Sequence, residues 1–168
     1  MQSGKIGPVY FVRVWNYRHQ GDAPPRPDAP VPPGLDWDAW QVDAPKKPFK
    51  MGYTSFRAWW EYGSGLVGDW GAHHMDIGYW AIGLPAPTSV VGKALTTPVP
   101  GGFTAISDYE VKFTYPNGVV FNVRSTPDDD PFGGTINPAG QRNGIRFEGS
   151  DGWIWVNRDE IKATDREL

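Results

Sequence analysis

The main helix of this chain is predicted by the segment Gly63-Ser-Gly-Leu-Val-Gly-Asp-Trp-Gly-Ala-His-His-Met-Asp-Ile-Gly-Tyr-Trp-Ala-Ile-Gly83. Glycine and serine open it, and Gly83-Leu-Pro85 is typical of a helix end, so we expect a helix over residues 64–82. Helical spacing places Asp69, His73, Asp76 and Trp80 on one stripe. His74 points about 100° away from that stripe.

The same segment gathers two of the three histidines of the chain. An imidazole one helical turn from a carboxylate forms an acid/base pair, because the carboxylate fixes the ring tautomer and raises the basicity of the far nitrogen. We therefore take His73 and Asp69 as the candidate catalytic residues. Two alternatives stay open. The histidine can be a buried structural residue, and Asp69, His73 and Asp76 can offer ligands to one metal ion. Ligands from a single helix rarely converge, so no metal site is predicted.

Strand signals surround this helix. Residues 8–15 alternate, with Val12 and Val14 on one face, and are rich in β-branched and aromatic side chains. Residues 108–115 and 119–124 flank Asn117-Gly118, a strong hairpin signal, and residues 144–148 and 153–156 flank a second turn. We expect an α+β fold, a largely antiparallel open sheet with the main helix and short helices packed on one face. Aromatic positions such as Tyr109 and Phe113 suggest that one helical layer leaves part of the sheet uncovered.

Two segments lack a regular pattern. Residues 21–48 are proline-rich and polar, which predicts an excursion over the surface, with one helical turn capped by Asp36 whose indoles act as anchors. Residues 128–134 contain an acidic triplet and predict a solvated loop. The triplet could hold calcium only if other oxygens converge there, and no EF-hand spacing is present.

Composition limits the function. The 168 residues are 39% hydrophobic, enough for one core, so residues 1–168 are expected to form a single domain. The net charge is −3 with no basic run, which argues against nucleic acid and anionic membranes as partners. The sequence shows no membrane-length apolar stretch and no signal peptide, so we expect a soluble chain, with the cytoplasm favoured. It has no cysteine, hence no disulfide.

The Asp69–His73 spacing after a glycine-rich turn resembles the second domain of the Gfo/Idh/MocA oxidoreductases, which carries a D-x-x-x-H pair on a helix. The likeness extends from residues 3–13 to residues 144–156, and Leu35-Asp-Trp-Asp-Ala-Trp40 and Phe56-Arg-Ala-Trp-Trp60 are similar to segments of the bacterial branch. The resemblance implies a substrate-binding and oligomerisation domain for a sugar or polyol. It also implies a homodimer or higher oligomer that pairs through the sheet.

Members of that family also have a nucleotide-binding domain with a glycine-rich turn after the first strand, and a later E-K-P segment that supplies a lysine. No glycine cluster here follows a hydrophobic strand and opens a helix, as a pyrophosphate cradle requires. We therefore expect no cofactor-binding residue in this chain, and NAD(P) only in the full-length family. The sequence is expected to be a domain cut out at both ends, or a gene that encodes only that domain.

Three function classes follow. In the first, resemblance assigns His73 as the acid/base for a substrate hydroxyl and Asp69 as a residue that orients substrate or imidazole, without hydride transfer by this chain alone. In the second, the pair serves a cofactor-independent hydrolase or lyase on a sugar, glycoside or lactone. In the third, the nine Trp residues serve a non-catalytic carbohydrate-binding or assembly module. The residues expected to contact the substrate are Trp15, Arg57, Trp70, His74 and Asp76.

Two neighbouring residues carry open alternatives. Arg57 can pair with Glu61 one turn later, a contact worth well under ~1 kcal/mol, or reach a substrate near the histidine. Trp59 and Trp60 cannot both face inward if their short segment is helical, so one of them is expected to line a pocket.

Overall fold

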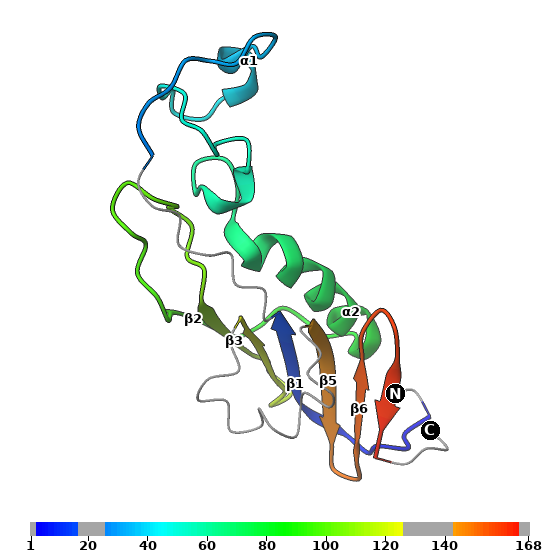
Figure 1. Cartoon of the computed structure of the whole chain (residues 1–168). Coiled ribbons are helices and arrows are strands. Elements are labelled where there is room, and N and C mark those ends of the chain that lie inside the picture. Colours follow the sequence, from blue (N-terminus) through cyan, green and yellow to red (C-terminus); the bar gives the residue numbers. More distant parts are fainter. Residues whose placement is uncertain (1–2, 17–25, 126–142, 165–168) are drawn as a thin grey trace.

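A seven-stranded sheet forms the base of the molecule in the computed structural model, which describes residues 3–16, 26–125 and 143–164 (Figure 1). The strand order is β2-β3-β4-β1-β5-β6-β7, and β1 pairs in parallel with β4 while the other neighbours are antiparallel. The strands are β1 (Val9–Asn16), β2 (Ser89–Ala94), β3 (Tyr109–Thr114), β4 (Val120–Arg124), β5 (Asn143–Gly149), β6 (Trp153–Val156) and β7 (Ile161–Ala163). The predicted α+β class with a largely antiparallel open sheet is confirmed.

The predicted main helix is confirmed, with one irregular turn. It consists of η2 (Val67–Gly71), a π-helical turn, followed directly by α2 (Ala72–Ile82). Gly83 ends the helix in the left-handed conformation, with φ 58°, and its N–H donates to the Tyr79 carbonyl at 2.8 Å. The shorter helices are α1 (Trp37–Gln41) and the 3₁₀ turn η1 (Phe56–Ala58).

Both predicted hairpins are present. The β3–β4 turn is closed by the Gly118 N–H, which donates to the Tyr115 carbonyl at 3.0 Å, and Gly118 has the positive φ of 83° that this turn needs. Strands β5 and β6 pair around residues 150–152. The edge strands β2 and β7 were not predicted from the sequence. All six residues of β2 are exposed, so no alternation marks it, and β7 has three residues.

The main core lies between α2 and one face of the sheet. Val12, Val14, Phe121 and Ile145 are fully buried there. Gly78 lets α2 approach the sheet closely, because a Cβ at this position would lie 2.4 Å from the Phe121 ring and 2.9 Å from Ile145. The aromatic positions Tyr109 and Phe113 pack in or against this same core. These side chains therefore belong to the helix-covered face, contrary to the expectation that they mark an uncovered part of the sheet.

The opposite face of the sheet is polar and aromatic. Arg13 donates to the Asn122 side chain, whose amide nitrogen donates to Glu110 at 2.9 Å. Arg146 pairs with Glu148 at 2.5 Å, and its guanidinium lies 4.2 Å from the centroid of the Trp153 ring. These side chains alternate with the core residues along β1, β4 and β5.

A second cluster of buried side chains lies in residues 26–62, here called the α1 lobe. Figure 1 shows α1 and the chain around it extending away from the sheet, beyond the N-terminal end of the main helix. The predicted capped turn is present, since the Asp36 carboxylate accepts from the Ala39 N–H at 3.0 Å. The buried members of the cluster are Trp37, Phe49, Tyr53, Ala58 and Trp59.

The remaining expectations have separate outcomes. Trp59 is 3% exposed and Trp60 is 70% exposed, so the two do not both face inward, and Trp60 lines a pocket described below. The acidic triplet at 128–130 lies outside the described residues. Within the described ranges, every helix is too short or too polar to cross a membrane.

Candidate functional site

The two neighbouring histidines lie on different faces of α2. His74 is 1% exposed and faces the sheet, one helical turn before Gly78. His73 is exposed, as are Asp76 and Trp80 further along the helix. The stripe predicted from the helical spacing is therefore the solvent-facing side of α2.

Asp69 lies within the π-helical turn η2. Its carboxylate accepts a hydrogen bond from the Arg57 Nε at 2.5 Å. Single π turns inside α-helices occur frequently at functional sites. The Arg57 side chain is 53% exposed, so the ion pair adds little to stability, under ~1 kcal/mol, and its main effect is to fix the direction of the carboxylate.

Of the two alternatives open for Arg57, pairing with Glu61 is not the one found, because Arg57 pairs with Asp69. Glu61, the alternative partner, is bound by Lys47 and by the Thr104 hydroxyl at 2.9 Å. In the described part of the chain no hydrogen bond or ion pair joins Asp69 to His73. The role of Asp69 in orienting the imidazole stays a prediction.

Trp70 packs between the two histidines. Its ring centroid lies 6.1 Å from that of His73 and 6.4 Å from that of His74, both edge-on. The Arg158 guanidinium, from the segment between β6 and β7, lies 5.0 Å from the Trp70 ring centroid. Sequence reasoning missed Arg158, because no local pattern connects it to a helix more than eighty residues earlier.

His74 is neutral at physiological pH. Burial lowers its pKa to about 4, a side-chain hydrogen bond with Asn143 opposes this shift, and electrostatic interactions with Arg158 and His73 lower the pKa further. Its Nε2 has no hydrogen-bond partner among the described residues. His74 therefore supports the helix from inside, and it presents no surface to a ligand.

Trp15 lies apart from these residues. It is fully buried on the sheet face opposite α2, where it stacks on Trp155 with ring centroids 6.1 Å apart. The structure thus brings Arg57, Asp69, Trp70 and His73 together at the start of the helix. It places Asp76 about one turn further along the exposed face.

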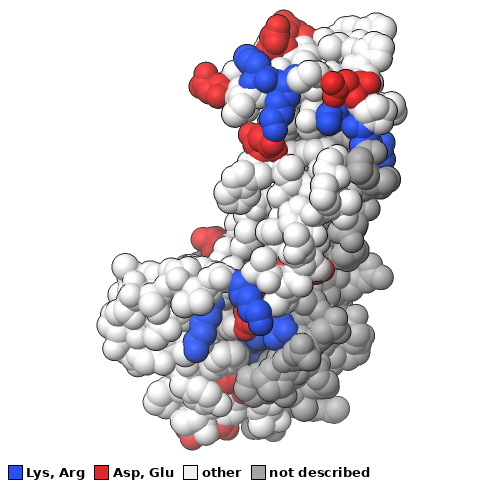
Figure 2. All heavy atoms as spheres, turned by 90° about the vertical axis from the view of Figure 1, so that its left-hand side faces the viewer, with Lys and Arg blue, Asp and Glu red and all other residues white. Residues whose placement is uncertain are grey.

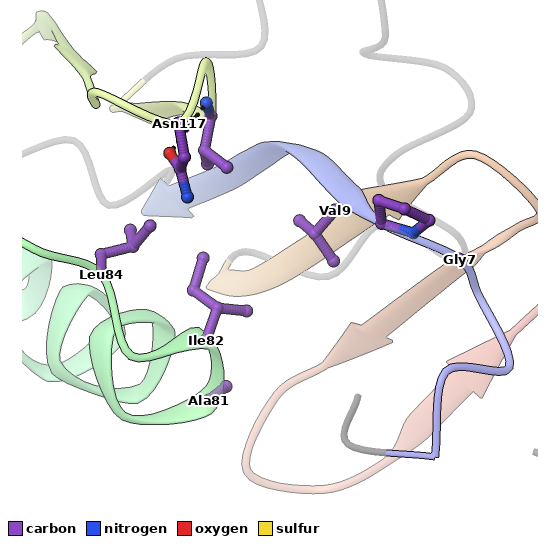
Figure 3. Close-up of a pocket in the computed structure, with 8 residues that line it drawn as sticks. Gly7, Val9, Ala81, Ile82, Leu84 and Asn117 are labelled. Atoms are coloured by element: carbon purple, nitrogen blue, oxygen red, sulfur yellow. Dashed lines mark hydrogen bonds between the residues drawn. The ribbon is translucent and has the colours of Figure 1, made fainter.

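The pocket drawn in Figure 3 lies at the other end of α2 and has a volume of about 340 Å³. Ala81, Ile82 and Leu84 border it from the helix end, with Val9 across from them and Asn117 on the β3–β4 turn. None of the predicted site residues lines it. A smaller apolar pocket of about 200 Å³ lies between Trp60, Val67 and strands β2 and β3. The candidate site is thus an exposed helix surface and is not part of either pocket.

The family comparison defines the class of this chain, the C-terminal domain of an oxidoreductase. Residues 11–131 match the family model described as "Oxidoreductase family, C-terminal alpha/beta domain". The chain belongs to this family, the Gfo/Idh/MocA oxidoreductases, as its sequence resemblance implied. No curated protein matches the chain.

Solved structures agree on the fold. The WlbA dehydrogenase from Bordetella pertussis, in complex with NADH and UDP-GlcNAcA, is 18% identical with a TM-score of 0.52, over 98% of this chain and 40% of that one. Levoglucosan dehydrogenase, in complex with NADH and levoglucosan, is 20% identical with a TM-score of 0.51, over 99% and 39%. An oxidoreductase domain protein from Kribbella flavida is 23% identical with a TM-score of 0.51, over 99% and 38%. The chain spans about two fifths of the length of these structures.

The described residues contain no glycine-rich strand-to-helix turn of the kind that holds a dinucleotide pyrophosphate. A pyrophosphate cradle needs a glycine-rich turn that leaves a strand and opens a helix. The longest described helix, α2, is instead preceded by the 3₁₀ turn η1 and the π turn η2. We therefore assign no described residue to the NAD(P) that the family implies.

Proposed function

We propose that this chain is the substrate-binding domain of an NAD(P)-dependent oxidoreductase that acts on a sugar or polyol. The observation that carries the proposal is the exposed imidazole of His73. It lies one turn after the Arg57–Asp69 ion pair and beside Trp70, on the face of α2 that points away from the sheet. The sugar ligands named for the related dehydrogenases support the substrate class.

His73 would move the proton of the reacting hydroxyl. An imidazole can accept a proton near neutral pH, and it must lie within hydrogen-bond reach of the hydroxyl that loses it. Asp69 would orient the substrate, with its carboxylate aimed by Arg57, and would stabilise a positive imidazolium through its charge. Hydride transfer would be the chemistry that NAD(P) supplies when bound in the full-length family. We place no step of that transfer on the residues of this chain.

Trp70 and Asp76 complete the proposed contact surface. The indole edge beside His73 offers an apolar contact for a sugar ring, and Asp76 can accept hydrogen bonds from its hydroxyls. His74 would act indirectly. Its burial under α2 fixes the rotation of the helix about its axis, and this sets the direction of the His73 side chain.

A sugar titration followed by NMR tests the proposal. Levoglucosan or UDP-GlcNAcA, added to the chain, should shift the His73 ring signals in a saturable manner and leave the buried His74 signals nearly unchanged. His73→Ala should reduce the affinity at least tenfold, and Asp69→Asn should reduce it less. Lys93→Ala, on the exposed strand β2, is the control.

The outcomes separate the function classes. Unchanged His73 signals at millimolar sugar would contradict the proposal. Release of product from a glycoside or lactone by the chain alone, lost in His73→Ala, would establish the cofactor-independent hydrolase or lyase in its place. Sugar binding that survives His73→Ala would place the ligand elsewhere on the molecule.

Self-association belongs to the same proposal. The family resemblance implies pairing through the sheet. On the face opposite α2, Arg13 and Arg146 are buried within this chain and Trp153 is partly exposed. Light scattering over a concentration series should show a dimer or larger species. A monomer at the highest concentration would contradict this part of the proposal.

A further inference from the structure

The α1 lobe contains a pocket that the proposed function does not use. Its volume is about 390 Å³, within the range of roughly 300–1,000 Å³ typical of small-molecule sites. Aromatic side chains of Trp40, Phe56 and Tyr62 line it, together with the carboxylates of Asp43 and Glu61. The pocket therefore combines apolar ring surfaces with hydrogen-bond acceptors.

The aromatic walls are held in place by the buried cluster of the lobe. Trp40 stacks on Trp37 with centroids 4.8 Å apart and meets Tyr62 edge-on at 4.8 Å. The Tyr62 hydroxyl donates to the Gln41 side chain at 3.3 Å. Phe56 is 42% exposed and the Arg57 guanidinium lies 4.7 Å from its ring centroid, so a ligand would contact the part of the ring that Arg57 leaves exposed. Rings fixed from behind in this way bind a ligand without losing much side-chain freedom.

The charges around the pocket are balanced. Burial raises the pKa of Glu61, but hydrogen bonds from Lys47, its own backbone and Thr104 outweigh burial, so its pKa lies below the usual value and it is ionised. The Lys46 ammonium donates to the carbonyls of Asp38 at 2.6 Å and Val42 at 3.2 Å. Figure 2 shows acidic and basic side chains interspersed over this lobe. Neither an anion nor a cation gains a large net attraction there.

Val42, on the rim of the pocket, has a strained backbone. Its φ of 47° and ψ of −118° are unusual for any residue with a side chain and more so for a β-branched one. Two hydrogen bonds hold the strained conformation. The Val42 N–H donates to the Ala39 carbonyl at 3.2 Å, and the Lys46 ammonium donates to the Val42 carbonyl. Backbone strain of this kind is often found at ligand clamps.

We propose that this pocket binds a neutral pyranose or polyol. The apolar face of the ring would lie against Phe56 and Trp40, and its hydroxyls would donate to the carboxylate of Asp43. A purely apolar ligand would offer no hydrogen-bond donor to the Asp43 carboxylate, whereas Glu61 already accepts from Lys47 and Thr104. This binding does not depend on His73 or on the proposed function of the α2 surface.

The test is a titration of the full chain with methyl glucoside, N-acetylglucosamine and levoglucosan, followed through the tryptophan indole N–H signals. The Trp40 signal should move in a saturable manner at millimolar sugar, also in the His73→Ala protein. Phe56→Ala and Asp43→Asn should each lower the affinity at least fivefold, and both change exposed side chains. Ile161→Ala, exposed on β7, is the matched control and should bind as the unchanged chain does.

Three results would overturn the proposal. The first is a Trp40 signal that stays unchanged when the sugar concentration is raised 50-fold above 1 mM. The second is sugar binding by the Phe56→Ala and Asp43→Asn proteins with the same affinity as the unchanged chain. The third is a saturable response to tetramethylammonium in the absence of any response to sugars, which would make the pocket a site for organic cations. A response lost in His73→Ala would assign the sugar to the α2 surface and also overturn it.

Discussion

The sheet with α2 and the α1 lobe are stabilised in different ways. The sheet unit buries aliphatic and aromatic side chains in a layer between helix and strands, with Val12, Phe121 and Ile145 fully covered. The lobe has one five-residue helix and a 3₁₀ turn, and its buried residues are mostly aromatic. Ring stacking can thus hold a segment that has little regular structure, because each large ring buries much surface in a single contact.

The largest effect should come from removing the central ring of the lobe. Trp37→Ala should cost about 3–5 kcal/mol of lobe stability, because Trp37 contacts four other rings and donates to the Lys47 carbonyl at 2.7 Å. Hydrogen exchange should show loss of protection in residues 26–62 and retained protection in β1 and β5. Trp60→Ala, which removes an exposed indole, should change little. Loss of protection throughout the sheet would mean that the two regions fold as one unit.

The next effect should be a pH dependence confined to the sheet unit. The pKa of His74 is lowered by burial to about 4 from 6.5, so the unfolded chain binds its proton more readily than the folded chain. The stability contribution is full above pH 6.5 and is lost progressively as the pH falls to 4, by up to about 3 kcal/mol. Urea unfolding of the wild type and His74→Gln should diverge in this window. The exposed control His73→Gln should follow the wild type.

A smaller effect is expected where α2 meets the sheet. Gly78→Ala places a methyl group 2.4 Å from the Phe121 ring, and the shift this forces should cost about 1–3 kcal/mol. Gly92→Ala in β2 is the matched control, because nothing lies within 4 Å of its new methyl group. Chemical denaturation measures both. Equal stability of the two variants would show that the helix can move away from the sheet at little cost.

The smallest effect should be local to α1. Asp36→Ala removes the side chain that accepts from Ala39 and should cost about 1 kcal/mol. The Ala39 amide should then exchange its hydrogen faster, while amides of β4 remain as slow as before. Asp43→Ala, after the end of the helix, serves as the control. Unchanged exchange at Ala39 would mean that ring packing alone fixes the turn.

The sequence predicted those elements that have a local cause. Asn117-Gly118 predicted a hairpin, Gly83 a helix end, and Asp36 a cap, and each is found where the pattern placed it. Strand β2 was missed because all of its residues are exposed, so burial imposes no alternation on it. The π turn η2 was missed as well, since its residues fit a regular helical pattern equally well.

The candidate site was predictable in its chemistry and less so in its contacts. The spacing placed His73 and His74 on different sides of a helix, and the structure shows which side is buried. Arg57 pairs with Asp69 and not with Glu61, because the chain turns between η1 and η2 in a way that no short pattern encodes. The burial of Trp15 depends on Trp155, which lies far away in sequence.

The parallel pairing of β1 with β4 has a consequence for how the chain folds. Arg13 and Asn122 face each other in the sheet although 109 residues separate them. Closing so long a loop costs entropy that later contacts must offset, and such non-local pairing slows folding. The hairpins β3–β4 and β5–β6 can form early from neighbouring segments. We therefore expect β1 to join the sheet late, between the β3–β4 and β5–β6 hairpins, which flank it in the strand order.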